Sequence, residues 1–180
     1  MHIDTPRLRL RPWTDQDIAA FAAINADAEV RRYYYPAILT PAQTKAIIED
    51  CQRHLRTHGF GFVAVERQAD GALVGGLGLS RTEDEIPGGP HVEIGWIFGR
   101  PYWRQGYAFE AASACLAHAW QHLGLEQVIG YTSSINTPSR ALMAKLGMRS
   151  DPTEDFPDMS VPEGNPLRPH TLYRIDRPTR

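Results

Sequence analysis

The sequence predicts a single domain of α/β (mixed α+β) class, with helices on both faces of a central mixed sheet. Strand-like and helical patterns follow one another in the order strand, helix, helix, three consecutive strands, helix, strand, helix, and one or two final strands. Two of the consecutive strands are joined by a hairpin signal, which predicts an antiparallel part of the sheet. A chain of 180 residues fits one domain over residues 1–180 and can bury roughly 70% of the surface its unfolded form exposes.

Alternation and capping signals predict the first strand and the first two helices. Residues 7–11 alternate polar and apolar side chains, which indicates a strand with one buried face. Thr14 offers an N-cap, and Asp17 three residues later makes a variant capping box for the first helix. The second helix begins at the sequence Thr-Pro-Ala-Gln of residues 40–43, with an N-cap, a proline at the first helical position and a glutamine that closes the box. Gly59 ends that helix.

The three consecutive strands form the centre of the predicted sheet. Residues 60–66 and 73–79 are strands joined by an Asp-Gly turn at residues 70–71. The second of these strands contains three glycines, which weaken it unless another backbone has to approach closely. A polar loop over residues 81–90 leads to the strand at residues 92–98, which is rich in β-branched and aromatic residues.

The remaining elements alternate between helix and strand. Alanine-rich and apolar periodicity without Pro or Gly predicts a long helix after residue 106, and Asn136 caps a shorter one that stops at Gly147. In order, we expect a helix over residues 107–122, a strand over 127–132, a helix over 136–145, a return to the sheet at 148–151, an irregular proline-rich loop over 152–169 and a final strand over 171–175.

Composition and charge exclude several classes of function. The net charge of −2 makes nucleic acid a poor candidate partner. No apolar run of 18 residues and no secretory leader pattern occur, so we expect no membrane association and a cytoplasmic protein. Cys51 and Cys115 lack the spacing of metal ligands, which predicts free thiols and no metal site. The oligomeric state, monomer or homodimer, is left open by the sequence.

The connector between the strand at residues 92–98 and the long helix is a candidate phosphate site. A strand that feeds a Gly-containing turn into a helix leaves several main-chain N–H groups without intrahelical partners, and the helix dipole adds partial positive charge there. Arg100 and Arg104 would add full charges. An ordinary strand-to-helix turn is the alternative. The P-loop signature is absent because no Lys follows Gly106, and the dinucleotide fingerprint G-x-G-x-x-G is absent as well.

Two motifs at this spacing resemble the GNAT superfamily of N-acetyltransferases. Residues 93–96 (E-I-G-W) with residues 102–111 (Y-W-R-Q-G-Y-A-F-E-A) resemble its acetyl-CoA-binding strand, loop and helix. Residues 136–148, in the pattern N-x-x-S-x-x-L-x-x-K-x-G-M, resemble its second signature, most closely in the branch of the ribosomal-protein N-terminal alanine and serine acetyltransferases. The resemblance extends from about residue 5 to residue 174. It implies a mostly antiparallel GNAT-like sheet that splays between the fourth and fifth predicted strands.

The resemblance also implies a binding site for acetyl-CoA as co-substrate. Main-chain amides of residues 104–108 would hold its pyrophosphate, pantetheine would lie in the splay, and Asn136 would hydrogen-bond to the pantetheine arm. The implied cofactor-binding residues are Ile94, Trp96, Ile97, Arg104, Gln105, Gly106, Tyr107, Ala108, Asn136, Ser139 and Lys145. Two positions depart from the common family pattern. Trp103 replaces an Arg or Gln, and Met143 replaces the Tyr that protonates the leaving thiolate in many members.

Glu93 and Ser139 are the candidate catalytic residues for moving an acetyl group to a primary amine in a ternary complex. Glu93 would act as base through a water, or would only orient the acceptor. His91, two residues earlier on the same strand face, is a second candidate or a surface histidine. Ser139, which that branch uses, would protonate the sulfur, donate a hydrogen bond to it, or only help to cap the helix. A main-chain N–H of residues 94–97 would meet the oxyanion.

The acceptor is a small-molecule or peptide amine whose identity the sequence leaves open. By the resemblance, its site would be built from residues 31–39 and from the acidic loop 152–169. Tyr33, Tyr34, Tyr35 and His91 are the candidate substrate-binding residues. Aromatic walls with carboxylates suit a cationic amine, whether a peptide N-terminus, a polyamine or an aminoglycoside. A non-catalytic acyl-CoA-binding or regulatory domain on the same fold is the alternative function.

Overall fold

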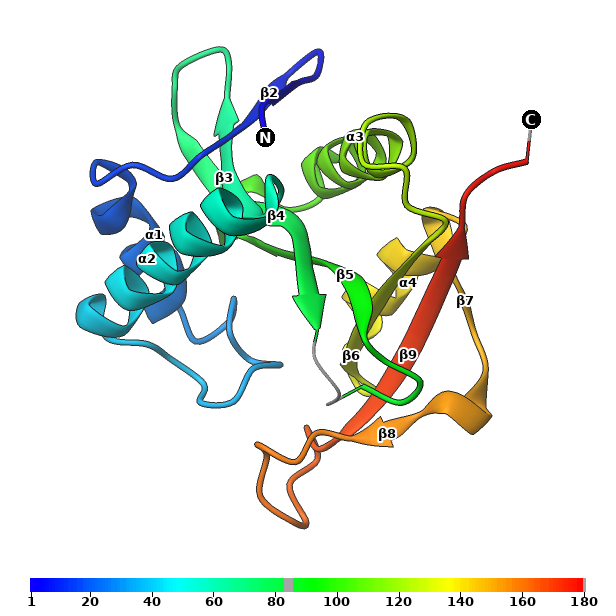
Figure 1. Ribbon diagram of the computed structural model, residues 1–180. Helices are drawn as coiled ribbons and strands as arrows, with labels where there is room; N and C mark the ends of the chain where they lie inside the picture. Colours follow the sequence, from blue (N-terminus) through cyan, green and yellow to red (C-terminus); the bar gives the residue numbers. More distant parts are fainter. Residues whose placement is uncertain (83–85, 180) are drawn as a thin grey trace.

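Nine strands form one mixed sheet within residues 1–82 and 86–179, the parts of the chain that the computed structural model describes (Figure 1). The strand order is β1-β2-β3-β4-β5-β6-β9-β7, and β8 also pairs with β9. The strands are β1 (Ile3–Asp4), β2 (Leu8–Arg11), β3 (Phe62–Arg67), β4 (Leu73–Thr82), β5 (His91–Phe98), β6 (Gln127–Ser133), β7 (Arg149–Ser150), β8 (Phe156–Pro157) and β9 (Pro169–Asp176). The α-helices are α1 (Asp17–Ala26), α2 (Pro41–His58), α3 (Tyr107–Gln121) and α4 (Thr137–Lys145).

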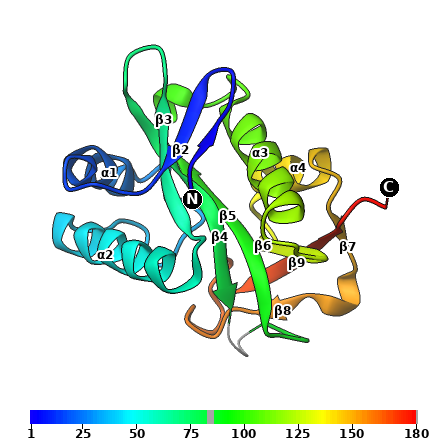
Figure 2. The same cartoon turned by 45° about the horizontal axis from the view of Figure 1, so that its top comes forward.

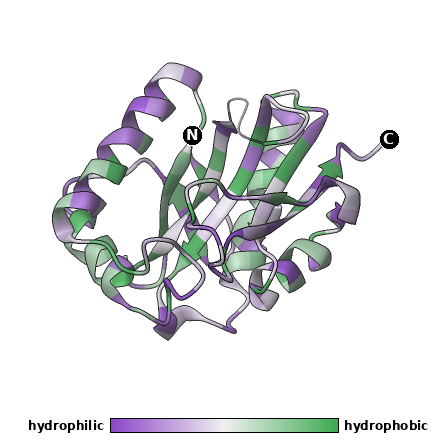
Figure 3. Ribbon diagram, turned by 90° about the horizontal axis from the view of Figure 1, so that it is seen from below, coloured by the Kyte–Doolittle hydropathy of each residue, from purple (hydrophilic) through white to green (hydrophobic). Residues whose placement is uncertain are grey.

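Helices cover both faces of the sheet, as the sequence predicts. Figure 2 shows α1 and α2 on one side and α3 and α4 on the other. Phe21 and Ile48 pack from the first pair against the sheet, in a cluster that includes Ile97 of β5. Ala111 and Cys115 of α3 are fully buried in the larger cluster on the opposite face, together with Ile94 of β5. Apolar residues accordingly gather along the central strands, while the helices carry both apolar and polar stretches (Figure 3).

The predicted helix boundaries agree with the structure except at the start of α1. The capping box of α2 is complete, and Gly59 ends that helix in the left-handed conformation. Asn136 caps α4 by accepting a hydrogen bond from the main-chain N–H of Ser139. In α1, however, the Asp17 carboxylate accepts hydrogen bonds from the main-chain N–H and the hydroxyl of Thr14, and the helix begins only at Asp17. Thr14 therefore precedes the helix by a turn and does not cap it directly.

The sheet opens between β5 and β6, which are the fourth and fifth strands of the sequence prediction. These parallel strands share the single register pair Glu93–Ile129, whereas β4 and β5 pair along their full overlap. The glycines of β4 explain how its neighbours come so close. A Cβ at Gly75 would overlap the carbonyl oxygen of Ile97, and one at Gly78 would overlap that of Gly61. The close approach of β4 to β5 on one side, and to the residue before β3 on the other, therefore requires glycine at these two positions.

Two short strands, β1 and β8, are absent from the sequence prediction, whereas β7 lies within the predicted return to the sheet at residues 148–151. Residues 152–169 are predicted to be irregular, yet β8 within them pairs with β9, next to a 3₁₀ turn at residues 152–154. β1 and β8 are two-residue strands, too short to show a pattern of alternation. Of the predicted loop over residues 81–90, residues 83–85 lie outside the described parts of the chain. None of the helices in those parts is long and apolar enough to cross a membrane.

Candidate active site

Two cavities meet beside the opening between β5 and β6. The larger has a volume of about 820 Å³ and is bounded by the end of β5, the start of α3 and the face of α4. The smaller has a volume of about 270 Å³ and lies between β5, β6, the connector after α1 and the loop before β9. The residues that line both cavities are Tyr33, Tyr34, Trp96, Asn136 and Ser139. A molecule in one cavity would therefore touch a molecule in the other at this junction.

The start of α3 forms one end of the larger cavity. Trp103 ties the preceding loop to the strand, because its indole N–H donates to the carbonyl of Phe98 at 2.7 Å. Arg104 and Gly106 both have positive φ, at 60° and 81°. The first intrahelical hydrogen bond runs from the N–H of Glu110 to the carbonyl of Gly106, so the earlier N–H groups of this turn have no intrahelical partner. Such a turn is suited to an anion.

An ion pair fixes this turn to the N-terminal strand. The Arg7 guanidinium lies 2.6 Å from the Glu110 carboxylate, donates to the carbonyl of Gln105 and stacks over the ring of Tyr107 at 4.7 Å. Burial opposes ionisation of Glu110, but hydrogen bonds from Thr5 and Arg7 outweigh it and lower the pKa of this carboxyl. The negative charge of Glu110 next to this turn is thereby paired.

The two cavities differ in the charges that line them. Arg32, Arg104 and Lys145 line the larger one, opposed by Glu29 alone among its described acidic groups. Lys145 also lies over the ring of Phe109, with its ammonium 4.5 Å from the ring centroid. Glu93, Asp158 and His170 line the smaller cavity, and no Lys or Arg is among the described residues around it. The larger cavity is thus suited to an anionic ligand and the smaller one to a cationic ligand.

The junction is a short hydrogen-bonded chain from β5 to β6 through α4. The indole N–H of Trp96 points to the Ser139 hydroxyl oxygen at 3.4 Å. The main-chain N–H of Ser139 donates to the side-chain carbonyl of Asn136, whose amide group donates to the hydroxyl of Thr132 at 2.8 Å. An amide nitrogen carries two N–H groups, so Asn136 keeps one for a ligand. The Ser139 hydroxyl lies at the N-terminus of α4, where partial positive charge favours an anion.

The connector after α1 is held over the junction by a buried arginine. Arg31 is 7% exposed, and its guanidinium donates to the side chain of Asn25 and to the carbonyls of Pro36 and Ala37. Its charge lies over the ring of Tyr34, 4.6 Å from the centroid. These contacts place the neighbouring tyrosine rings at the mouth of the smaller cavity.

Tyr34 links this connector to the central strand. Its hydroxyl donates to the carbonyl of Trp96 at 3.0 Å, although part of the ring is exposed. Burial of the hydroxyl and the neighbouring Glu93 carboxylate raise the pKa of Tyr34, outweighing the opposing effect of Arg31. The phenol is therefore a neutral hydrogen-bond donor at physiological pH.

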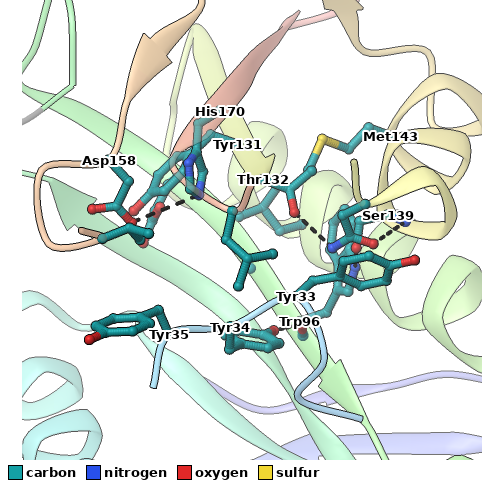
Figure 4. Close-up of a pocket in the computed structure, with 16 residues that line it drawn as sticks. Tyr33, Tyr34, Tyr35, Trp96, Tyr131, Thr132, Ser139, Met143, Asp158 and His170 are labelled. Carbon is teal, nitrogen blue, oxygen red and sulfur yellow. Dashed lines mark hydrogen bonds and ion pairs between the residues drawn. The ribbon is translucent and has the colours of Figure 1, made fainter. Parts of the chain in front are cut away.

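Asp158 and His170 form the end of the smaller cavity that lies away from Ser139 (Figure 4). The Asp158 carboxylate lies 3.8 Å from the Nε2 atom of His170. The ring of His170 also contacts those of Tyr131 and Phe156, with centroids 6.0 Å and 5.8 Å away. The wall at this end is aromatic, with one carboxylate and one imidazole.

Most of the predicted site residues line one of the two cavities. Those around the larger cavity are Tyr33, Tyr34, Trp96, Ile97, Arg104, Gly106, Tyr107, Ala108, Asn136, Ser139 and Lys145. Tyr35, Glu93 and Ile94 line the smaller one, where Ile94 is also part of the core on the α3 face. Gln105 and His91 line neither: the Gln105 side chain donates to the carbonyl of Pro101, and a ring nitrogen of His91 lies 3.1 Å from the carbonyl of Pro87.

Sequence reasoning missed several residues that line the smaller cavity. Thr132, Val161, Leu167 and His170 were not singled out, and Asp158 was not distinguished from the other carboxylates of its loop. Three residues separate Thr132 from Asn136 of the second motif. This nearness is the only signal in the sequence that could have indicated Thr132. His170 becomes part of the site only because β9 pairs with β6.

Comparisons with known proteins agree on one family. The family model described as Acetyltransferase (GNAT) domain matches residues 7–149. YnaD of Bacillus subtilis (strain 168), an uncharacterised N-acetyltransferase, is 31% identical over 97% of this chain and 96% of its own. An acetyltransferase of the GNAT family from Bacillus anthracis is 27% identical, with a TM-score of 0.81 over 98% of each chain. RimJ of Mycobacterium smegmatis, solved with CoA-disulfide, is 22% identical with a TM-score of 0.73, and it covers 94% of this chain and 81% of its own. At that identity RimJ indicates only the same fold.

Proposed function

Since this chain belongs to the acetyltransferase (GNAT) family and is an acyltransferase, we propose that it moves the acetyl group of acetyl-CoA directly to a primary amine. One observation carries the proposal. A larger cavity with a basic lining and an anion-binding turn meets a smaller acidic cavity at Ser139 and Trp96. Acetyl-CoA would enter the first with its thioester at the junction, and the amine would enter the second.

The start of α3 would bind the pyrophosphate of acetyl-CoA. The main-chain N–H groups of residues 104–108 supply donors, and the side chains of Arg104 and Lys145 supply charge. The pantetheine arm would run toward the opening between β5 and β6, where the free N–H of Asn136 can donate to one of its carbonyls. Each donor in this arrangement matches an acceptor of the ligand.

Glu93 would remove a proton from the attacking amine, through a water. Its position on β5 in the smaller cavity places it on the acceptor side of the junction. The neutral amine then attacks the thioester carbonyl, and a main-chain N–H of residues 94–97 would stabilise the oxyanion. His91 lies outside the cavity lining, so Glu93 is the better-placed base.

Ser139 and the N-terminus of α4 would assist departure of the thiolate. When the carbon–sulfur bond breaks, negative charge develops on sulfur at the junction, next to the Ser139 hydroxyl and the positive end of the helix dipole. The indole N–H of Trp96 points at the Ser139 hydroxyl oxygen, and this contact makes the Ser139 O–H a better hydrogen-bond donor. Ser139 either transfers this proton or shares it with the sulfur until water protonates it.

A covalent acetyl-cysteine intermediate does not fit the two cysteines of this chain. Neither lines either of the two cavities described above, and burial raises the pKa of Cys51 to about 11 and that of Cys115 to about 12. Thiols with such pKa values are poor nucleophiles at neutral pH. Direct transfer in a ternary complex, with both cavities occupied, is the mechanism that this arrangement supports. A non-catalytic acyl-CoA-binding domain would need neither the acidic cavity nor the Ser139 junction.

Thermal stability with acetyl-CoA tests the phosphate site. Binding at 100 times the dissociation constant should stabilise the native state by about 2.7 kcal/mol, which raises Tm. Gly106→Val should abolish that rise, because Gly106 has φ of 81° and begins the anion-binding turn. Gly124→Val is the matched control: Gly124 has φ of 65°, so its strain is similar, but it follows the C-terminal end of α3, at the opposite end of this helix from Gly106, and lines neither cavity. The control should lose stability and keep the acetyl-CoA effect. An unchanged rise in Gly106→Val would remove the phosphate assignment.

A further inference from the structure

We infer that the acceptor amine carries a second cationic group, and that Asp158 and His170 bind this second group at the far end of the smaller cavity. This inference rests on the proposed function, because it assumes that the smaller cavity holds the acceptor. It names the class of acceptor as compact dicationic amines, such as diaminoalkanes.

The hydrogen bonds of His170 leave an acceptor directed at the carboxylate. Its Nδ1 atom lies 3.1 Å from the carbonyl of Arg168, and a carbonyl can only accept, so Nδ1 carries the proton. In the neutral ring Nε2 is then a lone-pair acceptor. This nitrogen lies 3.8 Å from the Oδ2 atom of Asp158, which is also an acceptor, and His170 is 9% exposed. In this neutral form of the ring, two acceptors face each other at a separation too long for a hydrogen bond.

Only one carboxylate oxygen of Asp158 takes part in the hydrogen bonds that its side chain makes within the loop before β9. The Oδ1 atom accepts hydrogen bonds from the N–H and the hydroxyl of Ser160, at 2.8 Å and 2.7 Å. The Oδ2 atom is left toward the cavity with His170. An ammonium group supplies three N–H donors, so it can donate to both Oδ2 and Nε2, and its positive charge also pairs with the carboxylate, which a neutral donor does not offer. The nearby Tyr131 ring adds a favourable face for a cation.

The reacting amine cannot be the group that meets this pair. Transfer takes place at the junction, and Figure 4 shows Ser139 at the opposite end of the cavity from Asp158. A volume of about 270 Å³ limits the occupant to a compact molecule, near the lower bound of roughly 300 Å³ for ligand pockets. An acceptor that fills the cavity therefore presents one amine to Glu93 and a second to Asp158. Free amino acids are disfavoured, because no Lys or Arg among the described lining residues would receive their carboxylate.

Matched pairs of acceptors test this inference. Thiol release from acetyl-CoA is measured with diaminoalkanes of three to eight carbons and with the monoamines of the same lengths. We expect one diamine to exceed its matched monoamine at least tenfold in kcat/KM. Asp158→Asn keeps an oxygen for Ser160 and removes the charge, so the diamine-to-monoamine ratio should fall about tenfold, mainly through KM of the diamine. Glu163→Gln, in the same loop but exposed and outside both cavities, should leave the ratio unchanged.

Other outcomes overturn the inference. The inference is wrong if the diamine and the monoamine of each matched pair have equal kcat/KM in the unmodified protein. It is also wrong if Asp158→Asn lowers kcat/KM equally for both amines, which would indicate that Asp158 serves only the structure of its loop. Preference for a peptide N-terminus over every diamine, unaffected by Asp158→Asn, would assign the cavity to peptides. If acetyl-CoA binds and no acceptor reacts, the CoA-loaded protein is titrated with the diamines in a calorimeter. Diamine binding that weakens in Asp158→Asn supports the second-cation site, and absence of diamine binding refutes it. Failure to bind acetyl-CoA refutes the proposed function, and diamine titration of the free protein then tests the site by itself.

Discussion

Removing the Ser139 hydroxyl should slow acetyl transfer without unfolding the helix that carries it. The cap of α4 uses the main-chain N–H of Ser139, which donates to Asn136 at 3.3 Å and remains in Ser139→Ala. The lost hydroxyl oxygen only receives the long contact from the indole N–H of Trp96 at 3.4 Å. We therefore expect the free energy of unfolding to fall by no more than about 1 kcal/mol, or roughly 2–4 °C in Tm.

The kinetic effect should be much larger than the effect on stability. A hydrogen bond to a developing thiolate involves a charged partner and contributes about 1.5–3 kcal/mol, which corresponds to roughly 10- to 100-fold in kcat. KM for acetyl-CoA should stay within a few-fold, because the interaction forms only in the transition state. Steady-state thiol-release kinetics measure both. Ser113→Ala, the same change on α3 outside both cavities, is the matched control. Wild-type kcat in Ser139→Ala would refute the role at sulfur and leave Ser139 as a helix residue alone.

Two further predictions concern charge. Glu93→Gln should keep the acetyl-CoA effect on Tm, lose at least tenfold in kcat and alter the acidic limb of the pH profile; an identical profile would mean that the base is elsewhere or absent. Asp17→Asn should lower the free energy of unfolding by about 3 kcal/mol, because the Asp17 carboxylate is buried and accepts hydrogen bonds from the two terminal nitrogens of the Arg11 guanidinium and from the main-chain N–H and hydroxyl of Thr14. Burial alone would raise the pKa of Asp17, but these hydrogen bonds lower it, so its stabilisation is complete above the unfolded pKa of about 3.9 and is lost as pH falls below it. The free energy of unfolding, measured with urea between pH 7 and pH 3, should therefore fall less steeply toward acid pH in Asp17→Asn than in the unmodified protein. An equal fall in both proteins would contradict the role of the Asp17 carboxylate.

The parts of the fold that local patterns determine could be predicted from the sequence. The capping box of α2, the left-handed Gly59 and the cap at Asn136 each depend on residues within one helical turn. The glycines of β4 signal close backbone approach, which the contact of Gly75 with β5 confirms. Two-residue strands such as β8 escape detection because they form only by pairing with β9, which is a long-range interaction.

The candidate site likewise has one part that local motifs determine and one part that forms only through long-range packing. The turn at residues 103–106 and the Asn136–Ser139 pair are local motifs, so their residue types and spacing could be recognised. The smaller cavity is assembled from the connector after α1, from β5 and β6, and from the loop before β9. His91 shows the limit of period-two reasoning: it shares a strand face with Glu93, but it lies beyond the cavity and contacts the loop at Pro87. No spacing in the sequence could have shown that His170 faces Asp158.

The opposite charges of the two cavities have a consequence for how the substrates meet. Under the proposed function, the anionic end of acetyl-CoA is held by Arg104 and Lys145, and the cationic acceptor is attracted by Glu93 and Asp158. Each substrate would be repelled from the other's cavity, so the two can be bound together without competing. The junction itself is lined by neutral groups, including Ser139 and Tyr34, whose raised pKa keeps its phenol protonated. Charge created there during the reaction is then met by oriented donors and by the α4 dipole, and not by a fixed counter-charge that would bind the ground state equally well.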